Sequence, residues 1–551
     1  MPRPCTTSIA RLLCALALLV LPACADTPES AAPTRAARQA EAAAKPTVSV
    51  KPTSAARTDA APAYEPRFEP AGCPFDSAGG AIECGYLVVP ERRTSPDEAE
   101  VRLAVAIVRS TAKRPAPDPL VYLEGGPGGS ALYDASYWLD SRFRNKRDII
   151  LIDQRGTGYS LPSLNCPELE SEDVVTGDDE LDAAKACSRR LRREGVDLKH
   201  YNSAATAADL ADLRQALGLE EVNLLGVSYG TRAALTALRD FPEGIRSVIL
   251  DSSYPPEVDA YTEGAANGAA AIQALLGGCA ADADCAEAFP KLDRTLYRLV
   301  DKLNGEPAVL ERTDVDTGET YEEELYGDDL VSYLFDWLYD TSAIPLLPRA
   351  IAEAAEGDYS MIIYLLDGPT DEEAEEGIEE EEVAEEEAAE GVIDTAAADE
   401  GDISDSEGAF YSVECREEMI FGDLAAAEEA VSVYPRALQA ALLGSGEQTA
   451  AICEVWGSGR ARAVEDRPVT SDVPTLVLAG EYDPVTPPHW GESAAEHLSR
   501  SFFYTFPGMG HGVVFSDACP EEIALSFLER PGKEPDAACL ADLPGPVFEI
   551  P

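Results

Sequence analysis

The chain has 551 residues, 45% of them hydrophobic, and a formal charge of −58. Its length allows several domains, although α/β enzymes of this size also occur as one unit. So large a negative charge excludes nucleic acids and anionic lipid surfaces as electrostatically attracted partners, because phosphate groups are bound by Lys and Arg. With only four histidines and no Cys-x-x-Cys pair, the composition also argues against a metal centre, and we expect no metal and no cofactor.

Residues 1–24 have the pattern of an export signal. Two arginines precede the apolar run 12–21, which is too short to cross a bilayer as a mature helix. The segment Leu21-Pro22-Ala23-Cys24 resembles a lipobox, in which Cys24 becomes the lipidated N-terminus. Ordinary cleavage after Ala25 is the alternative.

Residues 25–66 are rich in Ala, Thr and Pro and contain almost no large apolar residues. Such a segment buries too little apolar surface to offset its ordering entropy, so we expect a flexible tether. The sequence therefore predicts an exported protein of the bacterial cell envelope, lipid-anchored or secreted. We expect a monomer that contacts the membrane only through a lipid anchor.

Ten of the thirteen cysteines follow Cys24. An even number of cysteines in an exported chain indicates disulfides rather than zinc ligands. Pairing by short spacing closes modest loops and predicts Cys73–Cys84, Cys166–Cys187, Cys279–Cys285, Cys415–Cys453 and Cys519–Cys539.

Short apolar runs separated by a helical pattern predict a doubly wound, mostly parallel α/β sheet in the first folded segment, 67–257. The helix is expected over 203–217, with Thr206 and Asp209 spaced like a capping box. After the strand at 148–152, a buried Asp153–Arg155 ion pair is expected to brace the turn. The other strands are expected at 86–90, 101–108, 120–123, 223–227 and 247–250.

Two stretches that follow predicted strands contain residues suited to catalysis. Gly226-Val227-Ser228-Tyr229-Gly230 has the Gly-x-Ser-x-Gly pattern of a nucleophile elbow, in which a tight strand-to-helix turn exposes the serine. The glycine-rich segment 125–130 allows a substrate to approach backbone N–H groups closely. We expect the N–H groups of Gly126 and Tyr229 to form an oxyanion hole.

From 258 to 466 the pattern is mainly helical, and the strand signal then resumes in 467–551. We interpret the helical block as a cap inserted into the sheet domain. Within it, the segment 371–407 contains nineteen acidic residues and no Lys or Arg, a composition typical of disordered or solvated surface.

The later strands supply the partners that a serine nucleophile needs. Asp483 follows the strand 475–479, and His511 follows the strand 502–506 between two glycines. The chain order Ser, Asp, His is that of an α/β-hydrolase triad. His200 precedes the serine, and His489 and His497 lie in or near a helix, so the sequence predicts Ser228, Asp483 and His511 as catalytic.

Several of these motifs together resemble the prolyl and tripeptidyl aminopeptidase branch of the α/β-hydrolases. The resemblance covers about residues 70 to 545 outside the acidic block, and its motifs are 125–130, 153–160, 226–231, 482–487 and 510–512. It implies an α/β-hydrolase fold with an inserted cap and an exported serine exopeptidase whose cap carboxylates hold the substrate's α-amine. Bacterial relatives include carboxylesterases, and Glu124 stands where prolyl aminopeptidases carry His, which argues against strict proline specificity.

We therefore expect release of one to three residues from peptide N-termini through an acyl-enzyme. Hydrolysis of small acyl esters is the alternative, and a non-catalytic acidic surface protein is a third reading that an intact triad disfavours. Among the cap acids, Glu417 and Glu418 are predicted to bind the α-amine, because Cys415 pins their backbone beside a disulfide.

Overall fold

The structure is a computed structural model that describes residues 64–170, 177–313, 320–368 and 403–550. The predicted signal segment with Cys24, nearly all of the tether 25–66, and most of the acidic segment 371–407 lie outside the described residues. The described residues all fall within one compact unit, Ala60–Pro551. Among the helices of these residues, none combines the length and the apolar character that a membrane span requires.

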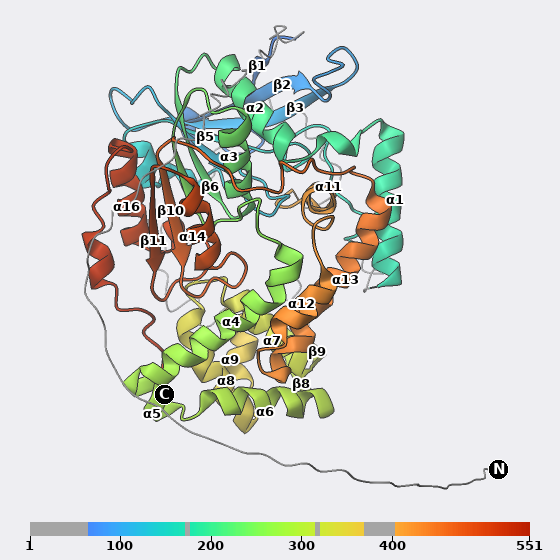
Figure 1. Cartoon of the computed structure of the whole chain (residues 1–551), viewed down its shortest axis with the longest axis vertical. Helices are drawn as coiled ribbons and strands as arrows, with labels where there is room; N and C mark the ends of the chain where they lie inside the picture. The colour runs from blue at the N-terminus through green and yellow to red at the C-terminus, as the bar shows by residue number, and fades with distance from the viewer. Residues whose placement is uncertain (1–63, 171–176, 314–319, 369–402, 551) are drawn as a thin grey trace, which may run out of the picture. The chain divides into compact units, whose positions relative to one another are not determined.

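A nine-stranded sheet forms the core, in the order β1-β2-β3-β5-β4-β6-β7-β10-β11 (Figure 1). The first three pairs in this order are antiparallel, and all pairs from β5 to β11 are parallel. The sheet is thus doubly wound and mostly parallel, as predicted. Its strands are β1 (Arg67–Ala71), β2 (Ile82–Pro90), β3 (Glu100–Val108), β4 (Leu120–Leu123), β5 (Ile149–Ile152), β6 (Val222–Val227), β7 (Ile245–Asp251), β10 (Thr475–Gly480) and β11 (Ser501–Phe506).

Helices cover both faces of the sheet, which explains its uninterrupted apolar strands. In β4, Leu120 and Tyr122 join one hydrophobic cluster, whereas Val121 and Leu123 join the other. The second cluster includes α2 (Ser203–Ala216), α3 (Tyr229–Asp240) and the partly buried Ala495 of α14 (Pro488–His497), and the first includes α15 (Val513–Ser516) and α16 (Ala518–Glu529).

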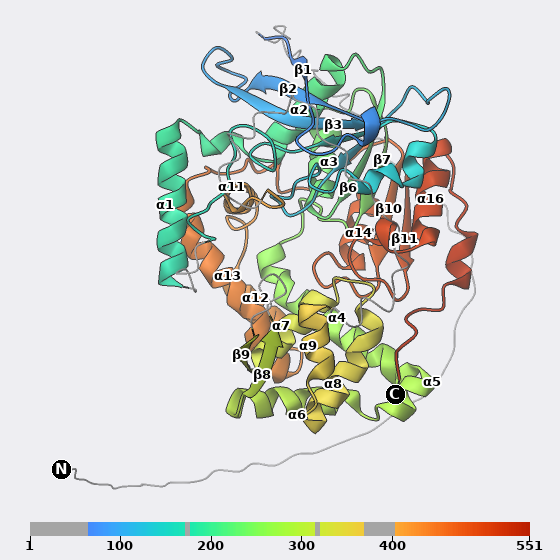
Figure 2. The ribbon, with the colours of Figure 1, turned by 180° about the vertical axis from the view of Figure 1, so that it is seen from behind.

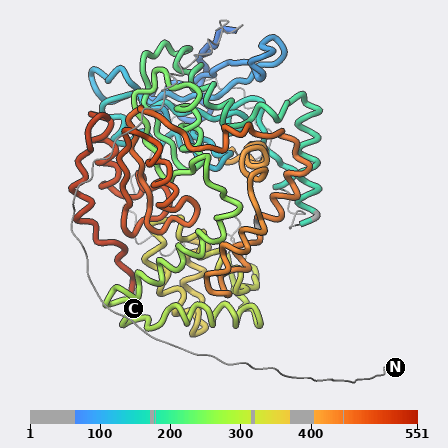
Figure 3. The backbone as a smooth tube through the Cα atoms, in the orientation of Figure 1, coloured from blue at the N-terminus to red at the C-terminus, as the bar shows by residue number. Residues whose placement is uncertain are grey.

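The chain leaves the sheet after β7, builds the cap, and returns at β10, as the tube in Figure 3 traces. In both ribbon views, α4 to α9 gather at the end of this unit opposite β1 to β3 (Figures 1 and 2). The helices after β7 are α4 (Ala260–Ala281), α5 (Ala283–Ala288), α6 (Leu292–Gly305), α7 (Gly327–Trp337), α8 (Leu347–Glu356), α9 (Ser360–Asp367), α11 (Glu407–Glu417), α12 (Leu424–Val431) and α13 (Arg436–Trp456).

Two further features complete the fold. The cap contains a two-stranded hairpin that the sequence analysis did not predict, formed by β8 (Ala308–Thr313) and β9 (Thr320–Leu325), whose side chains are mostly exposed. Before the serine strand, α1 (Asp178–Glu194) packs against α13. Short 3₁₀ turns occur at η1 (Ala78–Gly80), η2 (Tyr137–Leu139), η3 (Arg142–Asn145), η4 (Leu198–His200), η5 (Ile344–Leu346) and η7 (Ala538–Asp542).

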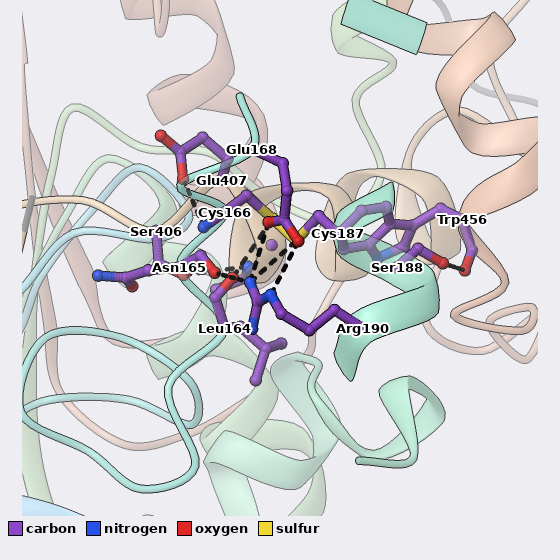
Figure 4. The surroundings of a disulfide bond; sticks show 12 residues. Leu164, Asn165, Cys166, Glu168, Cys187, Ser188, Arg190, Ser406, Glu407 and Trp456 are labelled. Carbon is purple, nitrogen blue, oxygen red and sulfur yellow. Dashed lines mark hydrogen bonds and ion pairs between the residues drawn. A yellow bond between two sulfur atoms is a disulfide. The ribbon is translucent and has the colours of Figure 1, made fainter. Parts of the chain in front are cut away.

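The five predicted cysteine pairs all form disulfides. Figure 4 shows the Cys166–Cys187 bond, which ties the loop before α1 to that helix. Glu168 lies close enough to both sulfur atoms to resemble a metal-binding group. The sulfur atoms bond to each other, however, and the Glu168 carboxylate accepts from Arg190 at 2.8 and 3.1 Å, so this cluster is a disulfide beside an ion pair.

Two local expectations about polar residues are wrong. Helix α2 is capped by Asn202, whose side-chain oxygen accepts from the Ala205 N–H at 3.1 Å, and not by a Thr206–Asp209 capping box. Arg155 does not pair with Asp153. Its guanidinium instead donates two hydrogen bonds to the buried Asp209, at 2.5 and 2.8 Å.

The Asp209 pair generates a stability prediction. Burial would raise the pKa of Asp209, but the Arg155 and Arg93 guanidinium groups outweigh it and lower that pKa. Asp209→Ala leaves Arg155 buried without its carboxylate, a change that typically costs about 3–5 kcal/mol. We expect the free energy of unfolding, measured by urea denaturation at neutral pH, to fall by about that amount.

The sign of the pH dependence follows from the lowered pKa. A carboxylate of this kind stabilises the fold above its unfolded-state pKa, and the contribution is lost as pH falls through the folded-state pKa. The difference between wild type and Asp209→Ala should therefore shrink in acid. Asp182→Ala, which removes the exposed partner of Lys185, is the control, and an equal loss there would contradict the prediction.

Candidate active site

Ser228 occupies the tight turn between β6 and α3. Its backbone angles, φ 56° and ψ −127°, lie in a region that non-glycine residues adopt at a cost and that is typical of strained functional turns. The flanking positions must be glycine, because the neighbouring backbone leaves no room for a β-carbon. A β-carbon on Gly226 would lie 2.4 Å from the Gly230 carbonyl oxygen, and one on Gly230 would lie 2.0 Å from that of Leu123. The segment thus has the geometry of a nucleophile elbow.

Asp483 follows β10 and His511 follows β11, and their side chains meet. His511 Nδ1 lies 2.9 Å from Asp483 Oδ2, and both residues are buried. Asp483 also accepts from the Val485 and Thr486 N–H groups at 3.0 and 2.8 Å. Burial alone would raise the pKa of Asp483, but His511 and these hydrogen bonds outweigh it and lower the pKa. The carboxylate therefore stays ionised at neutral pH.

The ionised carboxylate determines the state of the imidazole. Because a carboxylate only accepts hydrogen bonds, Nδ1 of His511 must carry the proton, which leaves Nε2 with a lone pair. Nε2 is buried and has no hydrogen-bond partner among the described residues. The arrangement supplies a base with its acceptor atom unoccupied, as proton transfer from a serine hydroxyl requires.

Thr486 was not identified from the sequence as a site residue. Its hydroxyl donates to Asp483 Oδ2 at 2.7 Å and lies 3.1 Å from His511 Nδ1. The hydroxyl therefore bridges acid and base and restricts how the two groups can rotate. The sequence signal was available, because Thr486 follows Asp483 at the i+3 spacing by which a carboxylate caps a turn.

The glycine-rich loop approaches the serine from the neighbouring strand, β4. A β-carbon on Gly125 would lie 2.9 Å from Ser228 Cβ, so the loop backbone and the serine are in contact. Gly126 has φ 99° and lines the same cavity as Ser228. Tyr229 is the first residue of α3, where backbone N–H groups have no acceptor within the helix. The two predicted oxyanion donors thus flank Ser228.

Two buried aspartates hold the loops of the site in place. Asp153 accepts from the Leu132 and Tyr159 N–H groups and from the Ser130 hydroxyl, and so connects the glycine-rich loop to β5. Asp251, at the end of β7, accepts from the Val513 and Val514 N–H groups at 3.2 and 2.7 Å, just beyond His511. Burial raises the pKa of Asp153 to about 7 and that of Asp251 to about 6.

A cavity of about 660 Å³ opens beside Ser228 between the sheet and the cap. Its walls come from the carboxyl ends of the strands and from α4, α7, α11, α12 and α13. Among the described residues, four carboxyl groups and no Lys, Arg or His line it, and the acids are Asp336, Glu414, Glu428 and Glu447. Another cavity, of about 470 Å³, lies within the cap and is lined by none of the three predicted catalytic residues.

Glu417 and Glu418 are buried, but neither is among the residues that line the cavity. Glu417 accepts from the Ser203 N–H and hydroxyl at 2.8 and 2.6 Å and lies 3.3 Å from Arg232 Nε. Glu418 pairs with Nη1 of the same arginine. Both carboxylates therefore neutralise Arg232, which is itself buried.

Glu414, one turn earlier on α11, is the member of this acidic group that lines the cavity. Its side chain hydrogen-bonds Tyr261. Burial raises the pKa of Glu414, and the Arg232 guanidinium only partly offsets that effect. Arg232 is shared among three carboxyl groups, so a cation entering the cavity would stabilise the ionised form of Glu414.

Residues 118–324 match the family described as alpha/beta hydrolase fold, and residues 443–539 match the family described as TAP-like protein. The chain is 27% identical over 481 residues to the serine protease Hip1 of Mycobacterium tuberculosis, which covers 82% of this chain and 85% of the relative. It is 33% identical over 201 residues to the tripeptidyl aminopeptidase of Streptomyces lividans, which covers 32% of this chain and 36% of that enzyme.

Among solved structures, the proline iminopeptidase of Mycobacterium smegmatis aligns over 81% of this chain and 99% of that chain, with 15% identity and a TM-score of 0.36. The two family matches lie on the parts of the chain that build the parallel sheet and carry Ser228, Asp483 and His511. The chain is therefore a hydrolase with the α/β-hydrolase fold, and its residues 443–539 match the TAP-like family.

Proposed function

We propose that this hydrolase is an exported serine exopeptidase that removes one to three residues from the N-termini of peptides. The observation that carries the proposal is the joint placement of Ser228 and the buried Glu414 on the lining of one cavity. The similarity to a serine protease and a tripeptidyl aminopeptidase supports a peptide substrate. Five disulfides support export, because such bonds persist in oxidising compartments.

The reaction follows from the geometry of the triad. His511 Nε2 takes the proton of the Ser228 hydroxyl while Oγ forms a bond to the substrate carbonyl carbon, and the carbonyl π electrons move to its oxygen. The Gly126 and Tyr229 N–H groups donate to that oxyanion. Collapse breaks the C–N bond, and His511 returns the proton to the leaving amine. That amine is the new N-terminus of the shortened peptide. Water then repeats the sequence on the acyl-enzyme and releases the N-terminal fragment as a carboxylic acid.

Glu414 would determine where the peptide is cut. An ammonium group at this carboxylate places the substrate's N-terminus in the cavity, so the distance to Ser228 limits the number of residues released. In our proposal, the amine contact that the sequence assigned to Glu417 and Glu418 belongs to Glu414, with the other two acids held on Arg232 behind it.

The nucleophile is tested by covalent labelling. Ser228→Ala should abolish labelling by a fluorophosphonate, and His511→Ala should nearly abolish it, because the hydroxyl then has no base. Ser499→Ala, which changes an exposed serine remote from β6, should label as wild type. Persistent labelling of Ser228→Ala would place the nucleophile elsewhere.

The acid and its bridging hydroxyl are tested by rate. Asp483→Asn should leave folding intact and lower kcat by about 10⁴-fold, as in other triads, because it no longer imposes the correct tautomer. Thr486→Val removes a hydrogen bond to an ionised carboxylate, worth about 1.5–3 kcal/mol, so we expect a loss of about ten- to a hundredfold in kcat. Thr486→Ser keeps the hydroxyl and should restore most of the rate. If valine is tolerated fully, the bridging hydrogen bond has no catalytic role.

Recognition of the amine is tested with matched substrates. N-acetylating a good peptide substrate should lower kcat/KM by about ten- to a hundredfold, the value of a charge-assisted hydrogen bond of about 1.5–3 kcal/mol. Glu414→Gln should cause a similar loss with free peptides and little further loss with acetylated ones. Glu429→Gln, on the exposed side of α12, is the control.

The raised pKa of Glu414 adds a pH signature. Because the carboxyl holds an ammonium only when ionised, discrimination between free and acetylated peptides should increase as pH rises toward neutrality. Equal turnover of acetylated peptides, free peptides and simple acyl esters at every pH would instead identify a carboxylesterase.

A further inference from the structure

A cap residue outside the predicted triad reaches the nucleophile. Tyr339 lies in the loop between α7 and η5, and its hydroxyl lies near that of Ser228. Its ring stacks on the His511 imidazole, with centroids 4.1 Å apart and an interplanar angle of 22°. The same side chain therefore touches both the nucleophile and the base.

The backbone around Tyr339 is held against the histidine loop. The His511 N–H donates to the Tyr339 carbonyl at 2.9 Å, and the Gly510 N–H donates to the Thr341 hydroxyl at 3.0 Å. A β-carbon on Gly510 would lie 2.4 Å from the Leu338 carbonyl oxygen, so the two loops are in direct contact. The position of the phenol is consequently set by the cap and by the sheet domain together.

The position of the Tyr339 hydroxyl beside Ser228 suits it to donate a hydrogen bond to the serine oxygen during the reaction. His511 Nε2 has no hydrogen-bond partner among the described residues, and the Tyr339 hydroxyl lies near the Ser228 hydroxyl. For attack, the serine proton must move to Nε2, and Oγ then gains negative charge before its bond to carbon is complete. A hydroxyl already beside Oγ can donate to it at that moment without reorganisation.

We propose that Tyr339 is a catalytic residue supplied by the cap, whose hydroxyl donates to Ser228 Oγ whenever that atom carries developing negative charge. This occurs twice in the reaction. In acylation, Oγ gains charge as its proton passes to His511 and before the C–O bond forms. In deacylation, the C–O bond breaks, Oγ leaves with the electron pair, and His511 reprotonates it.

The protonation state and surroundings of the phenol fit this role. Burial of the hydroxyl end, together with the Asp483 and Glu124 carboxylates, raises the pKa of Tyr339 above its usual value of 10. The hydroxyl therefore keeps its proton across any ordinary assay range and remains a donor. The residue as a whole is 43% exposed, so part of the side chain remains accessible to solvent while its ring contacts His511.

The test separates the hydroxyl from the ring. Tyr339→Phe keeps the stacking on His511 and removes only the donor, whereas Tyr339→Leu removes both. We expect Tyr339→Phe to lower kcat by about ten- to a hundredfold with little change in KM, and to slow fluorophosphonate labelling by a similar factor. The deficit should be the same at pH 6 and pH 9. Tyr364→Phe, a partly exposed tyrosine on α9, is the matched control and should behave as wild type.

The role proposed for Tyr339 rests on the proposed function in one respect only, which is that Ser228 is the nucleophile. The two proposals can therefore fail separately. Labelling and a simple acyl ester measure the Oγ reaction whether or not the enzyme prefers peptides with a free amine. Wild-type rates in Tyr339→Phe with a defect only in Tyr339→Leu would reduce the residue to packing on His511. Faster labelling of Tyr339→Phe would show that the phenol restrains the serine, and either result would overturn the proposal.

Discussion

The site depends on the parallel pairing of β6, β7 and β10. In this register Val227 lies opposite Asp251, and Asp251 lies opposite Leu478, so these strands end at the same edge of the sheet. Parallel strands bring side chains that are more than two hundred residues apart to one edge, which is where ligands bind in doubly wound folds. Ser228 and the loops that carry Asp483 and His511 begin from this common edge.

Buried carboxylates hold these loops in position, each by a specific set of donors. Asp153 accepts hydrogen bonds from the N–H groups of Leu132 and Tyr159. Asp251 accepts hydrogen bonds from the two N–H groups that follow Gly512. Asp483 accepts hydrogen bonds from the N–H groups two and three residues after it. Burying a carboxyl group is costly unless its oxygens are satisfied. This free-energy cost favours the observed arrangement of the loops, because in that arrangement backbone N–H groups donate to each buried carboxyl group.

The cap supplies the groups that the sheet lacks. Arg232 on α3 meets Glu417 and Glu418 at the end of α11, and this buried charge cluster joins cap and sheet. The same helix presents Glu414 to the cavity, and the loop after α7 brings Tyr339 to Ser228. An equivalent sheet with another cap would keep the acyl-transfer chemistry and lose these contacts, which is how one fold accommodates different substrates.

The order of the motifs along the chain was sufficient to predict the sheet, the elbow at Ser228, the Asp483 and His511 pair, and the five disulfides. These features depend on local patterns: apolar strand runs, glycines where backbones touch, and cysteines close in sequence. The contacts of Arg155, Glu414 and Tyr339 depend instead on how distant elements pack. Asp153 is nearer to Arg155 in sequence, yet α2 brings Asp209 to the guanidinium.

On α11, Glu414 and Glu418 are one turn apart and share a helix face. Only the packing of α3 against this helix decides that Glu418 contacts Arg232 and that Glu414 lines the cavity. Tyr339 carries no sequence signal at all, because its role comes from a loop that the tertiary fold presses against His511.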